Sequence, residues 1–391
     1  MQIQAGHGRR CITPPLGIGM VGYGSRTEGA QAIHDELFVN AVVLDDGQAP
    51  IALVALDLCL LQPHVAVQFK QAISDATDLP PERFFINTSH THAGPTLGGW
   101  GEPTAQVQAY LRDVLSKTTE AVGEALADRA PASFHVGSAP LDIGCNRRET
   151  VADGTVILGH DPEGPTMQEV TTWAFAREDR PTIVIFSTPM HGTTMGGKNL
   201  LISAEWMGWA VHHIEQDRPE VRSVFLQGCG ADQDPYYSTD LGGRGTLAEV
   251  EAHGRRAATA VGEAIENSKP LDSLPMATLL REVELAPKEI GDEPRTLFLH
   301  GARLGQALLL SLSAEAFVEF AKYGIAISPT EETLVLGYTD GNIGYLCTAD
   351  AYEEGGYEIR TTRVAPESEQ IVKNAMDRMV ADLTETTHGE R

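Results

Sequence analysis

Long apolar runs are missing from this sequence. The nearest candidate, residues 51–61, is interrupted by Asp57 and falls well short of the roughly 18 residues that a membrane-spanning helix needs. The N-terminal residues also lack the apolar core of a secretory signal peptide. We therefore expect no membrane insertion and no export.

Cysteine is scarce and unpaired in the sequence. The five cysteines stand at positions 11, 59, 145, 229 and 347, and no two of them form a CxxC pair. An odd, scattered set argues against a disulfide framework and against a zinc finger. Reduced thiols are typical of the cytoplasm, so the sequence predicts a cytoplasmic protein.

Positive charge is also in short supply. The 391 residues include 29 Lys and Arg against 54 Asp and Glu, which gives a formal net charge of −25. So acidic a protein is poorly suited to bind a phosphate backbone or an anionic membrane surface. We expect a small-molecule substrate and no nucleic-acid partner, and the sequence leaves open whether the chain forms a homo-oligomer.

Apolar residues, at 42% of the chain, are enough for a sizeable core. Short runs rich in Val, Ile and Leu alternate with amphipathic runs, which is typical of an α/β fold. No linker or repeat divides the chain, so we expect residues 1–391 to form a single large domain with a mixed β-sheet core flanked by helices. The predicted strands are 37–44, 50–58, 83–88, 182–188, 222–227, 306–312 and 333–338. The predicted helices are 66–77, 104–128, 205–216, 247–267 and 316–322. Residues 140–166 are predicted to form loops with a short strand, and residues 384–391 a frayed tail.

Polar segments follow directly on four of the predicted strands. They are residues 87–95, 189–195, 228–235 and 313–315. Open α/β sheets bind their ligands outside the carboxyl ends of the strands. We therefore expect these segments to converge on one crevice and to place a metal site at the C-terminal ends of the strands.

Histidines and a carboxylate in these segments carry the candidate chemistry. His90 and His92 have the i, i+2 spacing that points two side chains the same way on an extended chain. His191 and Glu315 follow two other strands. Taken singly, each has an ordinary explanation: chance spacing, a core histidine or a helix-capping carboxylate. Together, two histidines and a carboxylate are a normal ligand set of catalytic zinc, with a position left for water.

The same segments resemble the catalytic domain of neutral (non-lysosomal) ceramidases. The stretch His90-Thr91-His92-Ala93-Gly94-Pro95 is close to the HTHSGP signature of that family. The resemblance runs in unbroken order through residues 12–17, 33–35, 90–95, 146–147, 191, 227–235, 315, 345–348 and 352–358. It implies a zinc-dependent enzyme that acts on an amide bond.

Matching the family motif by motif implies roles for individual residues. His90, His191, Glu315 and Tyr345 take the places of the zinc ligands, with one Zn²⁺ per chain. His92 would then hydrogen-bond the substrate carbonyl or its oxyanion, and Arg147 falls where the family has an arginine that lines the site. Without the resemblance, Tyr345 would be read as a core aromatic.

Departures from the family bear on the substrate. Asp232 keeps the acidic residue of the family's GDVSPN segment, but Asp234 stands where that segment has serine. The chain also ends before the place of the family's C-terminal immunoglobulin-like domain, so we expect none. An extra carboxylate beside a metal, with no membrane-facing module, favours a soluble substrate over a two-chain lipid. We also expect the dication to depress the pKa of Asp234.

These observations predict a zinc-dependent hydrolase that cleaves an N-acyl amide bond of a soluble small molecule by metal-activated water. His92 would stabilise the oxyanion, and Asp234 or Asp232 would accept the proton of the water. Other readings stay open: hydrolysis of an ester, lactone or other C–O bond at the same site, a true ceramidase, a two-metal barrel amidohydrolase, or a zinc-bearing binding protein without catalysis.

Overall fold

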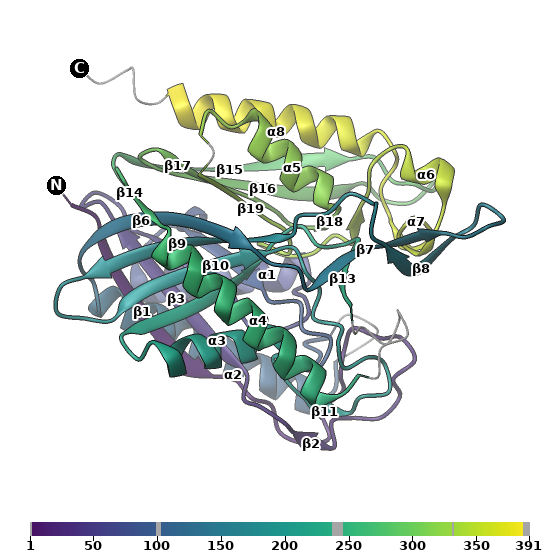
Figure 1. The fold of residues 1–391 in the computed structure, drawn as a ribbon, viewed down its shortest axis with the longest axis horizontal. Coiled ribbons are helices and arrows are strands. Elements are labelled where there is room, and N and C mark those ends of the chain that lie inside the picture. Colours follow the sequence, from purple (N-terminus) through teal and green to yellow (C-terminus); the bar gives the residue numbers. More distant parts are fainter. Residues whose placement is uncertain (1, 99–102, 237–244, 331, 386–391) are drawn as a thin grey trace.

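Two β-sheets packed face to face form the centre of the molecule (Figure 1), described here by a computed structural model that covers residues 2–98, 103–236, 245–330 and 332–385. The strands of the larger sheet are β1 (Gln4–Cys11), β3 (Phe38–Asp45), β4 (Ile51–Leu56), β5 (Phe84–Thr88), β6 (Ala130–Pro140), β9 (Glu169–Arg177), β10 (Thr182–Thr188), β12 (Val221–Gln227) and β14 (Lys269–Leu271). Their order is β12-β10-β9-β6-β1-β3-β4-β5, and β14 pairs with β6. The pairs β4–β5 and β10–β12 run parallel and the other neighbours run antiparallel, so the sheet is mixed.

The smaller sheet has the order β15-β16-β17-β19, formed by Met276–Leu285, Arg295–Leu304, Ala307–Leu312 and Thr333–Leu336. Short strands pair beside the two sheets: β2 (Ala32–Ile33) with β11 (Leu201–Ile202), β7 (Gly144–Thr150) with β8 (Val156–Asp161) and β13 (Gln233–Pro235), and β18 (Glu315–Ala316) with β20 (Tyr345–Leu346).

Helices cover the outer faces of both sheets. They are α1 (Pro63–Thr77), α2 (Ala105–Ala127), α3 (Glu205–Asp217), α4 (Leu247–Glu266), α5 (Val318–Ile327) and α8 (Ser368–Glu385), with the short η1 (Pro81–Arg83), α6 (Ala351–Glu354) and α7 (Tyr357–Thr361). Local sequence explains where several helices begin. Pro63 is the first residue of α1, and the Thr104 hydroxyl accepts from the N–H of Val107 at the start of α2. Thr246 and Glu249 form a capping box at the start of α4. Within the described residues, no helix is both long enough and apolar enough to cross a bilayer.

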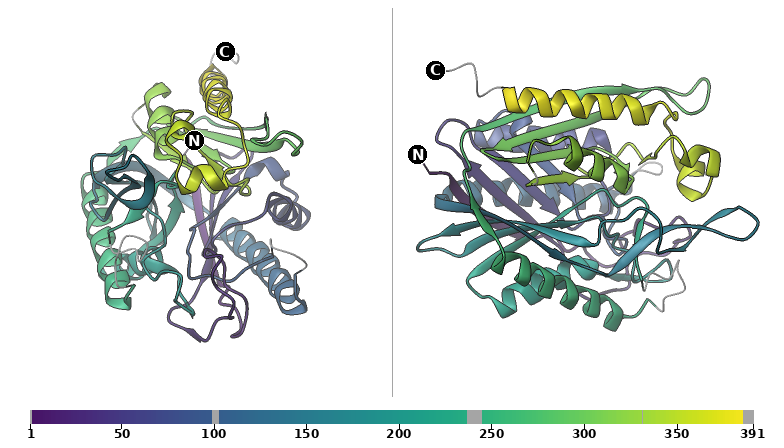
Figure 2. Two further views of the ribbon diagram at one scale, coloured as in Figure 1. Left: turned by 90° about the vertical axis from the view of Figure 1, so that its right-hand side faces the viewer. Right: turned by 45° about the horizontal axis from the view of Figure 1, so that its top comes forward.

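The two sheets and the helices on their outer faces form four layers, and buried apolar side chains pack between them. One cluster joins the facing sides of the two sheets and includes Phe85, Phe134 and Trp173. On its outer face the larger sheet packs against α1 and α2 at one side and against α3 and α4 at the other. The smaller sheet packs against α5 and α8, which lie on the opposite side of the molecule from α2, α3 and α4 (Figure 2). The expected fold class, a mixed sheet core flanked by helices, is confirmed.

Each strand and helix expected from the sequence has a counterpart, with ends shifted by a few residues. The largest shift concerns 316–322, because α5 begins at Val318 and continues to Ile327. Residues 140–166, expected to form loops with a short strand, carry two paired strands, the β7–β8 hairpin. Of the expected frayed tail, residues 384 and 385 still belong to α8, and residues 386–391 lie outside the described part of the chain.

One buried side chain joins the edge strands of the larger sheet. The Asn87 amide, at the end of β5, donates to the carbonyl oxygens of Gln227 (3.2 Å) and Gly337 (2.9 Å), and its Oδ1 accepts from the Gln227 N–H (2.8 Å). Gln227 ends β12, and Gly337 follows β19 of the smaller sheet. Asn87 therefore holds the ends of three strands from two sheets together, just before His90.

Replacing Asn87 with leucine should destabilise the fold at this junction. Leucine branches at the same carbon but cannot form hydrogen bonds. The substitution leaves the buried N–H of Gln227 without the Asn87 oxygen and removes one donor each from the carbonyls of Gln227 and Gly337, so we expect a loss of about 3 kcal/mol in the free energy of unfolding. Urea denaturation measures this loss. Asn374→Leu, on the exposed face of α8, is the matched control. Equal, small effects of both substitutions would show that Asn87 does not join the strands.

Candidate metal centre and active site

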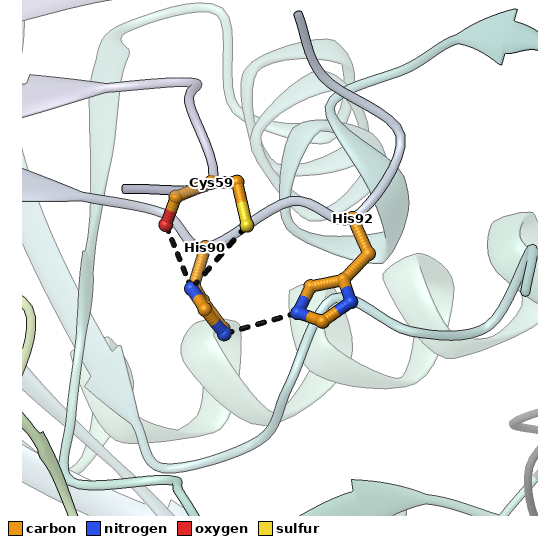
Figure 3. Close-up of side chains that lie close together, drawn as sticks. All are labelled: Cys59, His90 and His92. Carbon is orange, nitrogen blue, oxygen red and sulfur yellow. Dashed lines mark hydrogen bonds between the residues drawn. The ribbon is translucent and has the colours of Figure 1, made fainter. Parts of the chain in front are cut away.

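His90 reaches the site through an unusual backbone turn. β5 ends at Thr88, and His90 adopts a left-handed conformation with φ 59°. Its backbone N–H donates to Leu58 O (3.0 Å), and its Nδ1 lies 2.7 Å from Cys59 O (Figure 3). A carbonyl can only accept, so Nδ1 carries the hydrogen and Nε2 keeps its lone pair. The side chain is thus oriented as a metal-binding imidazole is.

His191 is oriented in the same manner from another strand. It follows β10, and its Nδ1 lies 3.1 Å from Gln233 O, which again leaves Nε2 with the lone pair. The indole N–H of Trp206 donates to the carbonyl of His191 (2.7 Å) and fixes its backbone. The ring centroids of His90 and His191 are 4.7 Å apart.

Glu315 completes the cluster from the second sheet. It begins β18, just after β17, and its Oε2 lies 3.5 Å from Nε2 of His90. The amide of Asn342 donates to the other oxygen, Oε1, at 3.1 Å. One ligand atom each from His90, His191 and Glu315 lies within 4.8 Å of the others, and all three residues are buried. The structure therefore brings together three of the expected metal ligands.

The electrostatics of the cluster suit a metal ion. Burial lowers the pKa of His90 and lowers that of His191 even further, with the Arg147 charge as a second cause for His191. Both rings are therefore neutral at neutral pH, as metal ligands must be. Two neutral imidazole nitrogens and one carboxylate oxygen at this spacing fit the donor preferences of zinc.

A second grouping, Cys59 with His90 and His92, is also close enough to hold an ion. Figure 3 shows why it fits less well: the Cys59 carbonyl already occupies Nδ1 of His90, and the thiol sulfur lies 3.7 Å from the same nitrogen. Burial strongly raises the pKa of the Cys59 thiol. The thiol therefore stays protonated, whereas a metal prefers the thiolate.

His92 faces the same space as the first cluster. Its Nε2 lies 3.0 Å from Nε2 of His90, and its Nδ1 has no hydrogen-bond partner in the described part of the chain. The Tyr23 ring packs against it in a T-shaped contact, with ring centroids 5.1 Å apart. Burial lowers the pKa of His92 well below its usual value. A neutral His92 can donate one hydrogen bond from Nε2 into this space.

Tyr345 and Arg147 close another side of the site. Register in the parallel pair β18–β20 places Tyr345 opposite Glu315. Arg147, in β7, donates to the Tyr345 hydroxyl (3.2 Å) and to Oε1 of Glu358 (2.8 Å), and its Nη1 lies 3.5 Å from Nε2 of His191. Arg147 thus lies next to the cluster, as expected for a residue that lines the site.

Asp234 is buried against Arg147 and His191. Its Oδ1 accepts from the Thr193 hydroxyl (3.1 Å) and lies 3.4 Å from Nη1 of Arg147 and 3.8 Å from Nδ1 of His191. Its Oδ2 has no hydrogen-bond partner among the described residues. In the protein alone, burial raises the pKa of Asp234, and Arg147 and Thr193 oppose that effect. The expected depression concerns the site with a dication bound and stays a prediction.

Asp232 faces a different part of the fold. One carboxylate oxygen accepts from the N–H of Val318, the first residue of α5, at 2.9 Å, and the other accepts from Asn146 at 2.8 Å. Asp232 therefore caps the start of α5 and holds β7 in place through Asn146. With both oxygens engaged, it is less suited than Asp234 to accept a proton.

Comparison with known proteins assigns the chain to a family. Residues 3–229 match the model of the neutral/alkaline non-lysosomal ceramidase N-terminal domain. The chain belongs to this family. It is 26% identical over 241 residues to a neutral ceramidase of Mycobacterium tuberculosis and 24% identical over 214 residues to one of Pseudomonas aeruginosa.

The chain matches only part of these ceramidases. The two alignments cover 56% and 51% of this chain but 38% and 31% of the relatives. The crystal structure of the Pseudomonas aeruginosa neutral ceramidase superposes with a TM-score of 0.81 at 17% identity, over 99% of this chain and 75% of that one. A ceramidase structure described as complexed with C2 gives the same TM-score. The architecture is therefore that of the ceramidase fold.

Sequence reasoning missed two residues of this ceramidase-like site. Asn342 orients the Glu315 carboxylate, and the guanidinium of Arg26 donates to the carbonyl of His92 at 2.6 Å. Asn342 lies in a Gly-rich stretch shortly before Tyr345, and that spacing was the one signal that could have pointed to it. Arg26 gives no comparable signal, because its partners are backbone carbonyls and those of His92, Gly196 and Gly197 are remote in sequence.

Replacing Asn342 with leucine should weaken metal binding without unfolding the protein. The Glu315 carboxylate would lose the hydrogen bond that holds it, and loss of such an outer partner typically costs about 10- to 100-fold in metal affinity. Competition with a chromophoric zinc chelator measures the affinity, and circular dichroism checks the fold. Unchanged affinity in a folded variant would show that Asn342 does not orient the ligand.

Proposed function

We propose that this protein is a zinc-dependent hydrolase that cleaves the N-acyl amide bond of a soluble small molecule. The single observation that carries the proposal is the buried cluster of His90, His191 and Glu315, with both imidazoles oriented by backbone carbonyls. Membership of the ceramidase family and the relatives named neutral ceramidase support the reaction class.

His90, His191 and Glu315 would hold the ion, with Tyr345 as a fourth ligand supplied by the neighbouring strand. When bound there, Zn²⁺ supplies a Lewis acid that polarises a carbonyl and makes water more acidic. Because the chain would supply one such ligand set, we propose one zinc ion per chain.

The surrounding side chains have separate tasks in the proposed reaction. His92 donates a hydrogen bond from Nε2 to the carbonyl oxygen of the scissile amide and stabilises the negative charge that develops on it. Arg147, held by Glu358 and Tyr345, binds the substrate. Asp234 accepts the proton of the attacking water through its Oδ2, which has no hydrogen-bond partner among the described residues.

Paired histidine variants test the metal and the enzyme together. His90→Gln should lose zinc and activity, whereas His92→Gln should retain zinc and lose turnover by roughly 10²-fold or more, because one donor to the oxyanion is removed. Elemental analysis gives the zinc content, and release of free amine from a panel of short N-acyl compounds gives the rate. A chelator should abolish activity and added zinc should restore it.

Adding matched esters and ceramide to this panel separates the alternative functions. Turnover of matched esters but not of amides would move the activity to C–O bonds. Efficient release of a long-chain base from ceramide in detergent would return the protein to the activity for which its relatives are named. A zinc-loaded protein that hydrolyses none of these compounds would favour a binding protein without catalysis.

Asp234→Asn tests the proposed base while preserving shape. A proton acceptor should lose roughly 10²-fold or more in kcat with KM little changed, whereas a substrate anchor should chiefly raise KM. Asp232→Asn is the comparison, since it should lower stability through the cap on α5. If Asp234→Asn alters neither kinetic parameter, Asp234 acts only in packing beside Arg147.

A further inference from the structure

Arg26 reaches three segments of backbone that surround the site. Its Nη1 donates to the carbonyls of Val21 (2.9 Å) and His92 (2.6 Å). Its Nη2 donates to Gly196 O (2.9 Å) and its Nε to Gly197 O (3.3 Å). Every nitrogen of the guanidinium is thus engaged by a backbone carbonyl.

Two of these three segments adjoin or carry the histidines of the site. Residues 192–197 follow directly on His191, and His92 lies two residues after His90. The two segments already touch, because the N–H of His92 donates to Gly192 O at 2.9 Å. Arg26 therefore ties the His90–His92 segment to the one after His191, and ties both to residues 21–26.

Residues 22 and 23 also shape the position of the His92 ring. The Arg26 guanidinium lies 4.9 Å from the centroid of the Tyr23 ring, and that ring makes a T-shaped contact with His92. A methyl group added at Gly22 would come within 2.7 Å of Cγ of His92, so this glycine lets the backbone approach the ring closely. Arg26 supports His92 at its carbonyl and, through Tyr23, at its ring.

The metal ligands are held by other groups. His90 is oriented by Cys59 O and His191 by Gln233 O, and neither bond involves Arg26. Removal of Arg26 is therefore expected to displace His92 and to leave the two ligands in place.

We propose that Arg26 is a positioning residue that fixes His92 relative to the metal ligands, an inference that rests on the proposed function only for the task it gives to His92. Arginine suits the position because its planar fork of donors can serve several carbonyls at once, whereas the single nitrogen of lysine cannot reach carbonyls on all sides. A small displacement of a catalytic group is enough to cost about 10²-fold in rate.

The test compares Arg26→Ala and Arg26→Lys with Arg222→Ala. Arg222 is the matched control, since it also donates to backbone carbonyls, those of Pro219 and Val221, but at the start of β12. We expect Arg26→Ala to retain its zinc and its KM and to lose roughly 10²-fold in kcat. Added guanidinium, at concentrations that do not unfold the protein, should restore part of the lost kcat. Arg26→Lys should fall between the wild type and Arg26→Ala, and Arg222→Ala should match the wild type.

A second readout does not depend on activity. In protein labelled with ¹⁵N-histidine, the ring signals of His92, identified with His92→Gln, should shift or broaden in both Arg26 variants, while those of His90 and His191 stay in place. Gly22→Ala, which pushes on the same ring, should move the same signals. If the alanine variant does not fold, Arg26→Lys is judged by these criteria.

The outcomes separate the two ideas. Unmoved His92 signals in the Arg26 variants, or equal shifts of His90, His191 and His92 with loss of zinc, would overturn the positioning role. A wild type that hydrolyses nothing would overturn the proposed function alone, since the histidine signals would still report whether Arg26 fixes His92.

Discussion

The carbonyl oxygens of Cys59 and Gln233 fix the orientation and the tautomer of the two histidines at the centre of this protein. Each accepts a hydrogen from Nδ1 of one histidine and thereby leaves Nε2 of that ring with its lone pair. The two histidines and Glu315 lie close enough together to share one ion. Burial lowers the pKa of both rings and keeps them neutral. Without these two bonds the imidazoles could rotate or change tautomer, and the cluster would have no defined geometry.

The two sheets must pack together before the cluster can form. His90 follows a strand of the larger sheet, Glu315 follows β17 of the smaller one, and the apolar layer between the sheets sets their separation. Asn87 joins the same strand ends by hydrogen bonds to both sheets. A buried polar junction of this kind is favourable only when all of its members are paired. The hydrogen bonds of Asn87 therefore support both the packing of the sheets and the position of the cluster.

The sequence predicted the parts of the fold in which local pattern and tertiary environment agree. Strands such as Thr182–Thr188 are nearly continuous apolar runs because helices or the other sheet cover both of their faces. Only one short strand was expected where the β7–β8 hairpin lies, because its Gly-, Asp- and Pro-rich sequence looks like a loop. The longer elements that were not expected at all are β1, β6, β9, β15, β16 and α8. Of these, β15 is only partly buried and its pattern is weak.

The site was predictable to a similar extent. His90, His92, His191 and Glu315 stand at strand ends, and the structure brings them together there. Tyr345 and Arg147 were named only through the family resemblance, since nothing in their local sequence marks them. Asn342 and Arg26 escaped notice because each acts through a contact distant along the chain, on Glu315 and on the carbonyls of His92 and Gly196 respectively.

The central claim is that His90, His191 and Glu315 hold one zinc ion. Crystals of the active, zinc-loaded protein, measured on both sides of the zinc absorption edge, test it directly through the anomalous difference map. The account predicts a single strong peak at about 2.0–2.2 Å from Nε2 of His90, Nε2 of His191 and an oxygen of Glu315. A peak between Cys59, His90 and His92 instead, or no peak at the cluster in crystals of active protein, would contradict it.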